Sequence, residues 1–221
     1  RESGGHTICV VCDGMGGAAG GRLASQIATE TFVDELERLL APGMEPEQLL
    51  SISARAVFAA NQAVREAAAE SEAYQNMGTT LVAAVSYAGG TVVTNVGDSR
   101  AYHVTREGIT RVTKDHSLVE RMVDRGDITA EEARRHPSRN LITRALGPDA
   151  DAQCDGSICP MESGEYLLLC TDGLVNTVTD QEMLFEVIHG AEPDTSLDRM
   201  LEIAKKQGAP DNVTAVLMRK L

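Results

Sequence analysis

The sequence of 221 residues predicts a single α+β domain in which helices cover antiparallel sheets. Short apolar runs joined by Gly-containing turns are typical of β-hairpins, and they occur at residues 79–87 and 91–96 and at residues 100–106 and 109–113. Apolar residues at helical spacing come in neighbouring segments, at residues 23–40 and 46–64, and again from residue 179 and around residue 197. Hairpins and paired helices favour helices packed on sheets over a regular alternation of strands and helices.

The first third of the chain is expected to contain one strand and two helices. Residues 8–12 form an apolar run and predict a buried strand. Residues 14–21 are rich in glycine and predict a flexible turn in which backbone can approach a ligand closely. Pro42 and Gly43 end the first predicted helix, and Pro46 suits the first turn of the second. Alanines on one face of that second helix predict close packing against the first.

The second half of the chain contains a polar insertion. Residues 114–147 are dominated by Lys, Arg, Asp and His and contain two short helical patterns, the second opened by a capping box of Thr129 and Glu132. This segment is too polar for a core and is expected to lie at the rim. Beyond it, a strand is predicted to end at Asp172 and a last strand to start at Asn212, with two helices between them.

The charge balance limits the partners that the chain can have. Lys and Arg number 20 and Asp and Glu 33, which gives a formal charge of −13. This excess argues against nucleic acid or an anionic membrane as the main partner. No apolar stretch approaches the ~20 residues of a membrane span, and no charged-then-apolar leader precedes the domain. We therefore expect a cytoplasmic protein without a membrane span, and a monomer.

Five cysteines, an odd number, do not resemble a disulfide framework. Cys9 and Cys12 lie three positions apart in a predicted strand and should face opposite sides, which disfavours a zinc or redox pair. Cys154 and Cys159 are expected in a polar loop without a second pair of ligands, so zinc is not expected there either. No cysteine is followed six positions later by arginine, as the loop of a thiol phosphatase requires.

Four aspartates, Asp13, Asp98, Asp172 and Asp211, lie at the edges of apolar runs, each beside Gly, Ser or Asn. A single Asp-Gly is more typical of a turn, because Asp bonds its own backbone and Gly accepts positive φ. Four such sites, each tied to a predicted strand, favour an oxygen-rich pocket at the rim if the fold brings them together. Carboxylates, a carbonyl and water are the ligands that suit Mg²⁺ or Mn²⁺.

Seven motifs, in order along the chain, resemble those of the metal-dependent serine/threonine protein phosphatases of type 2C, and the bacterial branch matches best. They are Asp13-Gly14-Met15-Gly16-Gly17, Gly78-Thr79-Thr80, Val96-Gly97-Asp98-Ser99-Arg100, Lys114-Asp115-His116-Ser117, Leu141-Ile142-Thr143-Arg144-Ala145-Leu146-Gly147, Thr171-Asp172-Gly173-Leu174 and Asp211-Asn212-Val213-Thr214. The resemblance spans nearly the whole chain. It implies two antiparallel sheets stacked as a sandwich with helices on both outer faces, and a flap formed by residues 114–147 beside the substrate groove.

The resemblance also implies the roles of the site residues. Asp13 would bridge two manganese or magnesium ions, the carbonyl of Gly14 would bind one of them, and Asp172 and Asp211 would hold the other. Asp98 would share a third, weaker ion with Asp172. Asp13, Asp172 and Asp211 would then be the catalytic set, because a water bridging the two ions would attack the phosphorus in line.

Two features depart from the family pattern. Members normally begin with a strand that carries a phosphate-gripping arginine; this chain starts past that strand, so the predicted sandwich lacks it, and Arg1 is not equated with that arginine. Met15 stands where eukaryotic members place a histidine proposed as general acid. His116 is a candidate substitute, but a structural role is more typical of a histidine in a polar segment. Arg100 and Arg144 could grip phosphate, although ion pairs with the surplus carboxylates are the expected role.

The sequence thus predicts an enzyme that hydrolyses phosphoserine and phosphothreonine in proteins, with a bacterial serine/threonine kinase and its targets as partners. Two alternatives stay open. A catalytically weak regulatory module is suggested by the absent first strand, but the set of Asp13, Asp172 and Asp211 argues against it. A stress-signalling phosphatase acting on an anti-sigma antagonist is disfavoured because that branch generally lacks the flap.

Overall fold

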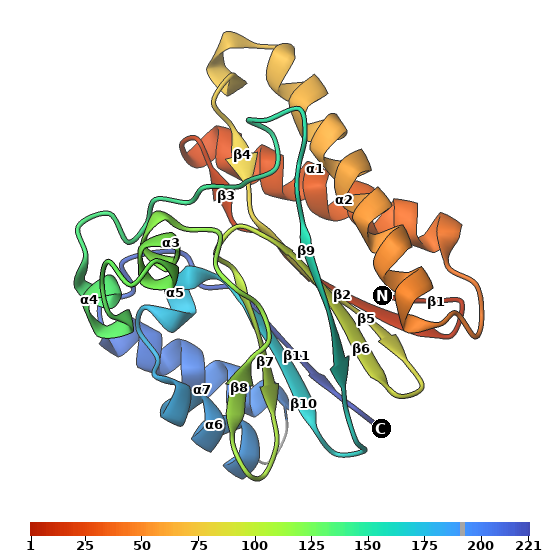
Figure 1. Cartoon of the computed structure of the whole chain (residues 1–221), viewed down its shortest axis with the longest axis vertical. Coiled ribbons are helices and arrows are strands. Elements are labelled where there is room, and N and C mark those ends of the chain that lie inside the picture. Colours follow the sequence, from red (N-terminus) through yellow and green to blue (C-terminus); the bar gives the residue numbers. More distant parts are fainter. Residues whose placement is uncertain (191–192) are drawn as a thin grey trace.

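The computed structural model describes residues 1–190 and 193–221 and has four layers, with helices outside and two sheets inside (Figure 1). One sheet has the strand order β1-β2-β5-β6-β9 and the other the order β11-β10-β7-β8. Neighbouring strands in both sheets are antiparallel. The predicted α+β sandwich is therefore confirmed.

The first sheet consists of β1 (Glu2–Ser3), β2 (His6–Val11), β5 (Leu81–Tyr87), β6 (Gly90–Val96) and β9 (Asp155–Pro160). The second consists of β7 (Arg100–Val104), β8 (Ile109–Arg111), β10 (Tyr166–Cys170) and β11 (Ala215–Arg219). A short additional pair, β3 (Gly14–Met15) and β4 (Gly78–Thr79), extends beyond β2 and β5. The β5–β6 and β7–β8 hairpins were both predicted and are confirmed.

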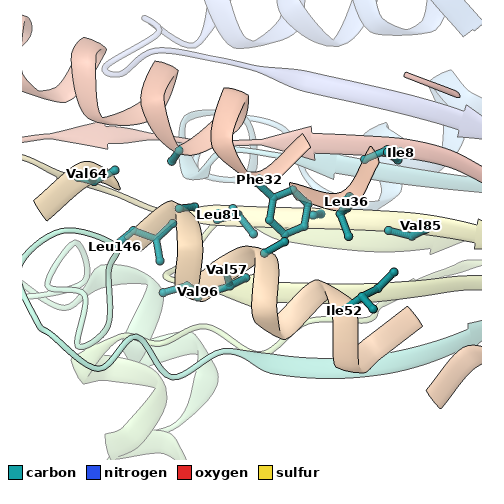
Figure 2. Close-up of a cluster of buried hydrophobic side chains, with 14 of the residues drawn as sticks. Ile8, Phe32, Leu36, Ile52, Val57, Val64, Leu81, Val85, Val96 and Leu146 are labelled. Carbon is teal, nitrogen blue, oxygen red and sulfur yellow. The ribbon is translucent and has the colours of Figure 1, made fainter. Parts of the chain in front are cut away.

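Three apolar layers hold the sandwich together. Helices α1 (Ala18–Leu39) and α2 (Pro46–Ala69) pack on the first sheet around fully buried side chains such as Phe32 and Leu36 (Figure 2). The layer between the sheets contains Val82 and Leu167. On the far face, α5 (Asp172–Val175), α6 (Asp180–His189) and α7 (Pro193–Lys206) cover the second sheet.

Helix α1 begins earlier than predicted, so the expected flexible turn at residues 14–21 is wrong for its second half. Gly20 and Gly21 are buried in the first turns of α1. A Cβ on Gly21 would lie 2.6 Å from the carbonyl oxygen of Gly14. The glycines therefore serve close packing of the helix against the strand end. Helix α2 starts at Pro46, as predicted.

Cys154 lies in a loop, as predicted, but Cys159 lies in a strand, and for Cys159 the prediction is wrong. Residues Asp155–Pro160 form β9, an edge strand paired with β6. An edge strand buries little of its length, so its apolar pattern is weak, and in β9 only Cys159 is buried. Cys12 packs with the helix-side cluster and Cys9 with the cluster between the sheets, as expected of residues facing opposite sides.

The polar segment 114–147 contains α3 (Leu118–Asp124) and α4 (Ala130–Arg135). The capping box of Thr129 and Glu132 at the start of α4 is confirmed. A 3-10 turn, η1 (Glu72–Tyr74), follows α2, and the last strand starts at Ala215 rather than at residue 212. Within residues 1–190 and 193–221, none of the helices combines the length and apolarity of a membrane-spanning segment.

Candidate metal centre

Asp13 lies two residues after the end of β2, and two threonines fix its backbone. The N–H of Asp13 donates to Thr80 Oγ1 at 3.0 Å, while Thr79 Oγ1 and the Thr80 N–H both donate to the Asp13 carbonyl at 2.9 Å. Both threonines are buried, whereas Asp13 is only half-buried. The hydrogen bonds to buried hydroxyls therefore hold the Asp13 carboxyl at the rim of the sheet.

Asp98 lies in the turn between β6 and β7. The residue after it, Ser99, is buried and shares a hydrogen bond of 2.7 Å between its Oγ and Thr80 Oγ1. Gly97, the residue before it, has φ 101° and leaves no room for a side chain, since a Cβ would lie 2.6 Å from Thr80 Cγ2. Because the same Thr80 hydroxyl accepts the N–H of Asp13, Thr80 joins the two aspartate turns.

Asp172 is the first residue of α5, and Asp211 lies in the exposed loop before β11. The two segments pack against each other, because Thr171 Oγ1 donates to the Asn212 carbonyl at 3.2 Å. At Gly173 a Cβ would come within 2.3 Å of the same carbonyl oxygen, so only glycine permits this approach. The packing brings residues from distant parts of the chain to one edge of the sandwich.

The carboxyl groups at this edge influence one another. Burial, followed by the charges of Asp172 and Asp211, raises the pKa of Asp13 to about 7. Burial, followed by the charge of Asp172, raises the pKa of Asp98 to about 7. Burial and the charge of Asp211 raise the pKa of Asp172. Such shifts arise where carboxylates are crowded and partly desolvated, and a cation among them would relieve the repulsion.

The donor chemistry of this edge fits a hard divalent cation. All candidate donors are oxygen atoms, and Gly21 has no side chain to cover the Gly14 carbonyl oxygen, since a Cβ there would lie 2.6 Å from it. The side chains are not arranged as a formed metal site. In the described part of the chain, no group of three or more His, Cys, Asp or Glu side chains could hold an ion as it stands. The oxygens thus match Mg²⁺ or Mn²⁺ in kind, and binding requires the carboxylates to draw together.

The other candidate residues lie in ion pairs. Arg100 donates to both oxygens of Asp115, with Nε–Oδ1 2.9 Å and Nη2–Oδ2 2.6 Å. Arg144 Nη1 donates to Asp155 Oδ1 at 2.8 Å, so both expected ion pairs are present. His116 is buried and also contacts Asp155. No sequence signal singled out Asp155, because it lies in the edge strand that was not predicted.

Nearly the whole chain is similar to known proteins. The family model of protein phosphatase 2C matches residues 1–218. The chain belongs to the protein phosphatase 2C family. Among curated relatives, "Serine/threonine phosphatase stp" of Listeria innocua is 32% identical over 213 residues, which cover 96% of this chain and 84% of the relative.

Solved structures of this family agree with the fold. The crystal structure of Stp1 from Staphylococcus aureus has a TM-score of 0.90 at 33% identity and covers 98% of this chain and 84% of its own. The catalytic domain of the phosphatase PstP, solved in complex with 2 manganese ions, has a TM-score of 0.79 at 31% identity and covers 98% of this chain and 91% of its own. This chain is therefore a serine/threonine protein phosphatase of a family whose structures include a manganese complex.

Proposed function

We propose that this phosphatase 2C domain hydrolyses phosphoserine and phosphothreonine monoesters in proteins with Asp13, Asp172 and Asp211 as its catalytic metal ligands. The observation that carries the proposal is the crowding of these carboxyls at one edge, where burial and mutual charge raise the pKa values of Asp13 and Asp172. A site that holds several carboxylates close together in a half-buried position gains most from a divalent cation.

Each of the five candidate ligands has a defined part in the proposed site. Asp13, whose backbone is fixed by Thr79 and Thr80, and the carbonyl of Gly14 would hold one ion, while Asp13, Asp172 and Asp211 would hold a second. Asp98 and Asp172 are suited to a third, weaker ion. Bound there, two divalent ions would lower the pKa of a water between them and neutralise a phosphoryl group for in-line attack. Either Mn²⁺ or Mg²⁺ meets these needs.

Hydrolysis of a generic aryl phosphate and of a phosphothreonine peptide tests the proposal. Turnover should require added Mn²⁺ or Mg²⁺ and should be lost in excess chelator, because no side chain is needed as nucleophile. Thiol alkylation is the control: burial raises the pKa values of Cys12 and Cys170 to about 12, so alkylation should leave turnover nearly unchanged. Undiminished turnover in excess chelator would contradict the metal mechanism.

Replacing Asp98 by asparagine should have a milder effect than replacing either Asp13 or Asp172. In the proposed site Asp98 would bind only the third ion, so the two ions held by Asp13 and Asp172 would still bind. We expect turnover of an aryl phosphate to fall while calorimetry still detects the tighter Mn²⁺ binding. Loss of all Mn²⁺ binding in Asp98→Asn would place Asp98 among the ligands of the pair instead.

We also propose that residues 114–147 act as a flap that influences the choice of protein substrate. The segment carries seven basic and six acidic residues on a protein whose formal charge is −13. Within the described residues, no ion pair involves the flap arginines Arg121, Arg125, Arg134 and Arg139. Arg135 contacts Glu131 at 3.4 Å, but both side chains are about four-fifths exposed, so this pair is weak. Unpaired arginines could attract acidic flanks of a phosphopeptide.

Substituting Arg134 and Arg135 together by alanine tests the flap. We expect kcat/KM to fall for phosphopeptides, and more steeply for acidic ones, while turnover of a small aryl phosphate is unchanged. The comparison of an acidic with a neutral phosphopeptide at two salt concentrations measures the electrostatic part. An equal loss on peptide and aryl phosphate would place the segment in the catalytic machinery, and no loss on either would leave it as scaffold.

The partners that we propose are phosphorylated proteins, among them a serine/threonine kinase and its targets. The names of the relatives, serine/threonine phosphatases of bacteria, support this class of substrate. A purely regulatory module is disfavoured because Asp13, Asp172 and Asp211 lie near enough at one edge for their charges to influence one another. A monomer fits the high formal charge of −13, which opposes self-association.

A further inference from the structure

His116 contacts the turn that carries Asp98 at two points. The side chain and backbone of His116 are only 6% exposed. Its N–H donates to the Gly97 carbonyl at 2.9 Å, and its ring Nδ1 accepts the N–H of Gly97 at 3.1 Å. Gly97 directly precedes Asp98, and the residue after Asp98 is held from the other side by the Ser99–Thr80 hydrogen bond. Asp98 thus lies between two fixed neighbours.

The hydrogen bonds define the tautomer of the His116 ring. Since Nδ1 accepts the Gly97 N–H, a neutral ring carries its proton on Nε2. Nε2 lies 3.2 Å from Asp155 Oδ2 and 3.1 Å from Arg144 Nη1. Because Nδ1 already accepts a proton and arginine can only donate, Nε2 carries the ring proton and donates to Asp155 Oδ2, while Arg144 Nη1 donates to Asp155 Oδ1 at 2.8 Å. A protonated ring would lose its acceptor toward Gly97, and burial lowers the pKa of His116, which keeps the ring neutral.

The same histidine joins both ends of the flap. His116 lies near the first end, and its carbonyl accepts the N–H of Thr143 near the second end at 2.7 Å. The next residue, Ser117, forms an isolated β-bridge with Ile142. The base of the flap and the Gly97–Asp98 turn are therefore joined through one residue.

We propose that His116 is a positioning residue for the metal site: its Nδ1 holds Gly97 so that the Asp98 carboxylate faces Asp172 and ligates a divalent cation. The inference rests on the proposed function, because the orientation of Asp98 matters only if this edge binds cations. The ring acts through Gly97 and does not touch substrate. A histidine that only filled space would tolerate any neutral replacement of similar size.

Two neutral substitutions of His116 separate these roles. In His116→Asn the side-chain oxygen can stand near the position of Nδ1 and keep the bond to the Gly97 N–H. In His116→Gln the longer side chain places its amide near the position of Nε2, toward Asp155, and offers Gly97 no acceptor. Both variants lose the ring, so the cost in packing is similar. The two should differ only where the contact to Gly97 matters.

Calorimetric titration with Mn²⁺ and amide hydrogen exchange provide the readouts. The weaker Mn²⁺ binding event, identified as the one that Asp98→Asn removes, should weaken about tenfold or more in His116→Gln, in line with the usual effect of losing a group that orients a ligand. It should stay close to wild type in His116→Asn. Exchange at the Gly97 amide should speed up in His116→Gln and stay slow in His116→Asn, without any metal. With an aryl phosphate, kcat should fall in His116→Gln while KM is unchanged.

A double mutant distinguishes positioning from a general loss of fold. In an Asp98→Asn background, His116→Gln should reduce kcat no further, because the ligand that it orients is already gone. Equal effects of the Asn and Gln variants, or a full additional loss in the double mutant, would overturn the proposal. The Gly97 exchange and the Mn²⁺ titration do not depend on turnover, so a wild-type protein that binds Mn²⁺ without hydrolysing phosphate would contradict the proposed function and leave this inference standing.

Discussion

Replacing Asp13 by asparagine is expected to reduce phosphatase activity by roughly 10³-fold or more, since a first ligand of a metal pair supplies several kcal/mol of transition-state stabilisation. Asp13 lies at the rim and is only half-buried, and the hydrogen bonds that hold it involve its backbone, which asparagine retains. The fold should therefore survive. The removal of one charge from a group of repelling carboxylates should raise the free energy of unfolding of the metal-free protein.

Thermal unfolding with and without Mn²⁺ checks this prediction alongside the activity. Mn²⁺ at 100 times its Kd should stabilise the wild-type protein by about 2.7 kcal/mol, and this gain should be nearly absent in Asp13→Asn. Asp34→Asn is a matched control, because Asp34 is an exposed residue of α1, about 20 Å along the helix from Gly21. Equal Mn²⁺ affinities in the wild type and in Asp13→Asn would show that Asp13 is not a ligand.

Replacing Gly14 by alanine is expected to affect both stability and metal binding. The added Cβ would lie 1.8 Å from the carbonyl oxygen of Gly21, a distance that forces strand end and helix apart. Overpacking of this kind costs about 1–3 kcal/mol, and more where backbone atoms on both sides must move. Since the Gly14 carbonyl is a proposed ligand and Asp13 is its neighbour, the displacement should also weaken Mn²⁺ binding.

Gly108→Ala is the control for this substitution. Apart from its two chain neighbours, no atom of the described residues lies within 4 Å of a Cβ at Gly108, which is in the turn between β7 and β8. The same change should therefore leave the unfolding free energy almost unchanged there. Denaturant unfolding compares the two variants, and Mn²⁺ calorimetry follows the site. A Gly14→Ala protein with wild-type stability and Mn²⁺ affinity would mean that the close approach of α1 to residue 14 is not required.

Local sequence signals were sufficient for most of the helices and hairpins. Pro46 and the capping box of Thr129 and Glu132 predicted where α2 and α4 begin, because both act on backbone groups within one turn. The β5–β6 hairpin could be predicted for the same reason, because its turn residues Gly89 and Gly90 act locally. Edge strand β9 was missed, since the burial that would mark it is confined to Cys159.

The start of α1 was misjudged because glycine has a low helix propensity, and tertiary packing overrides it here. Gly20 and Gly21 are helical because the helix must approach Gly14 and Met77, with a Cβ on Gly20 lying 3.1 Å from Met77 Cβ. The contact between Gly20 and Met77, which are distant in the sequence, has no local signal.

By itself the sequence determined the four aspartates, their places at the edges of apolar runs and the order of the family motifs, because these are properties of neighbouring residues. Only the tertiary structure decided that Thr80 joins the turns of Asp13 and Asp98, and that His116 and Asp155 support Gly97. These contacts link residues that are 19 to 67 positions apart, and they exist only once β2, β5 and β6 have paired and His116 has packed against the end of β6. The chemical type of a side chain is a property of the local sequence. The orientation of a carboxylate depends on buried hydrogen bonds between residues that are distant in the sequence.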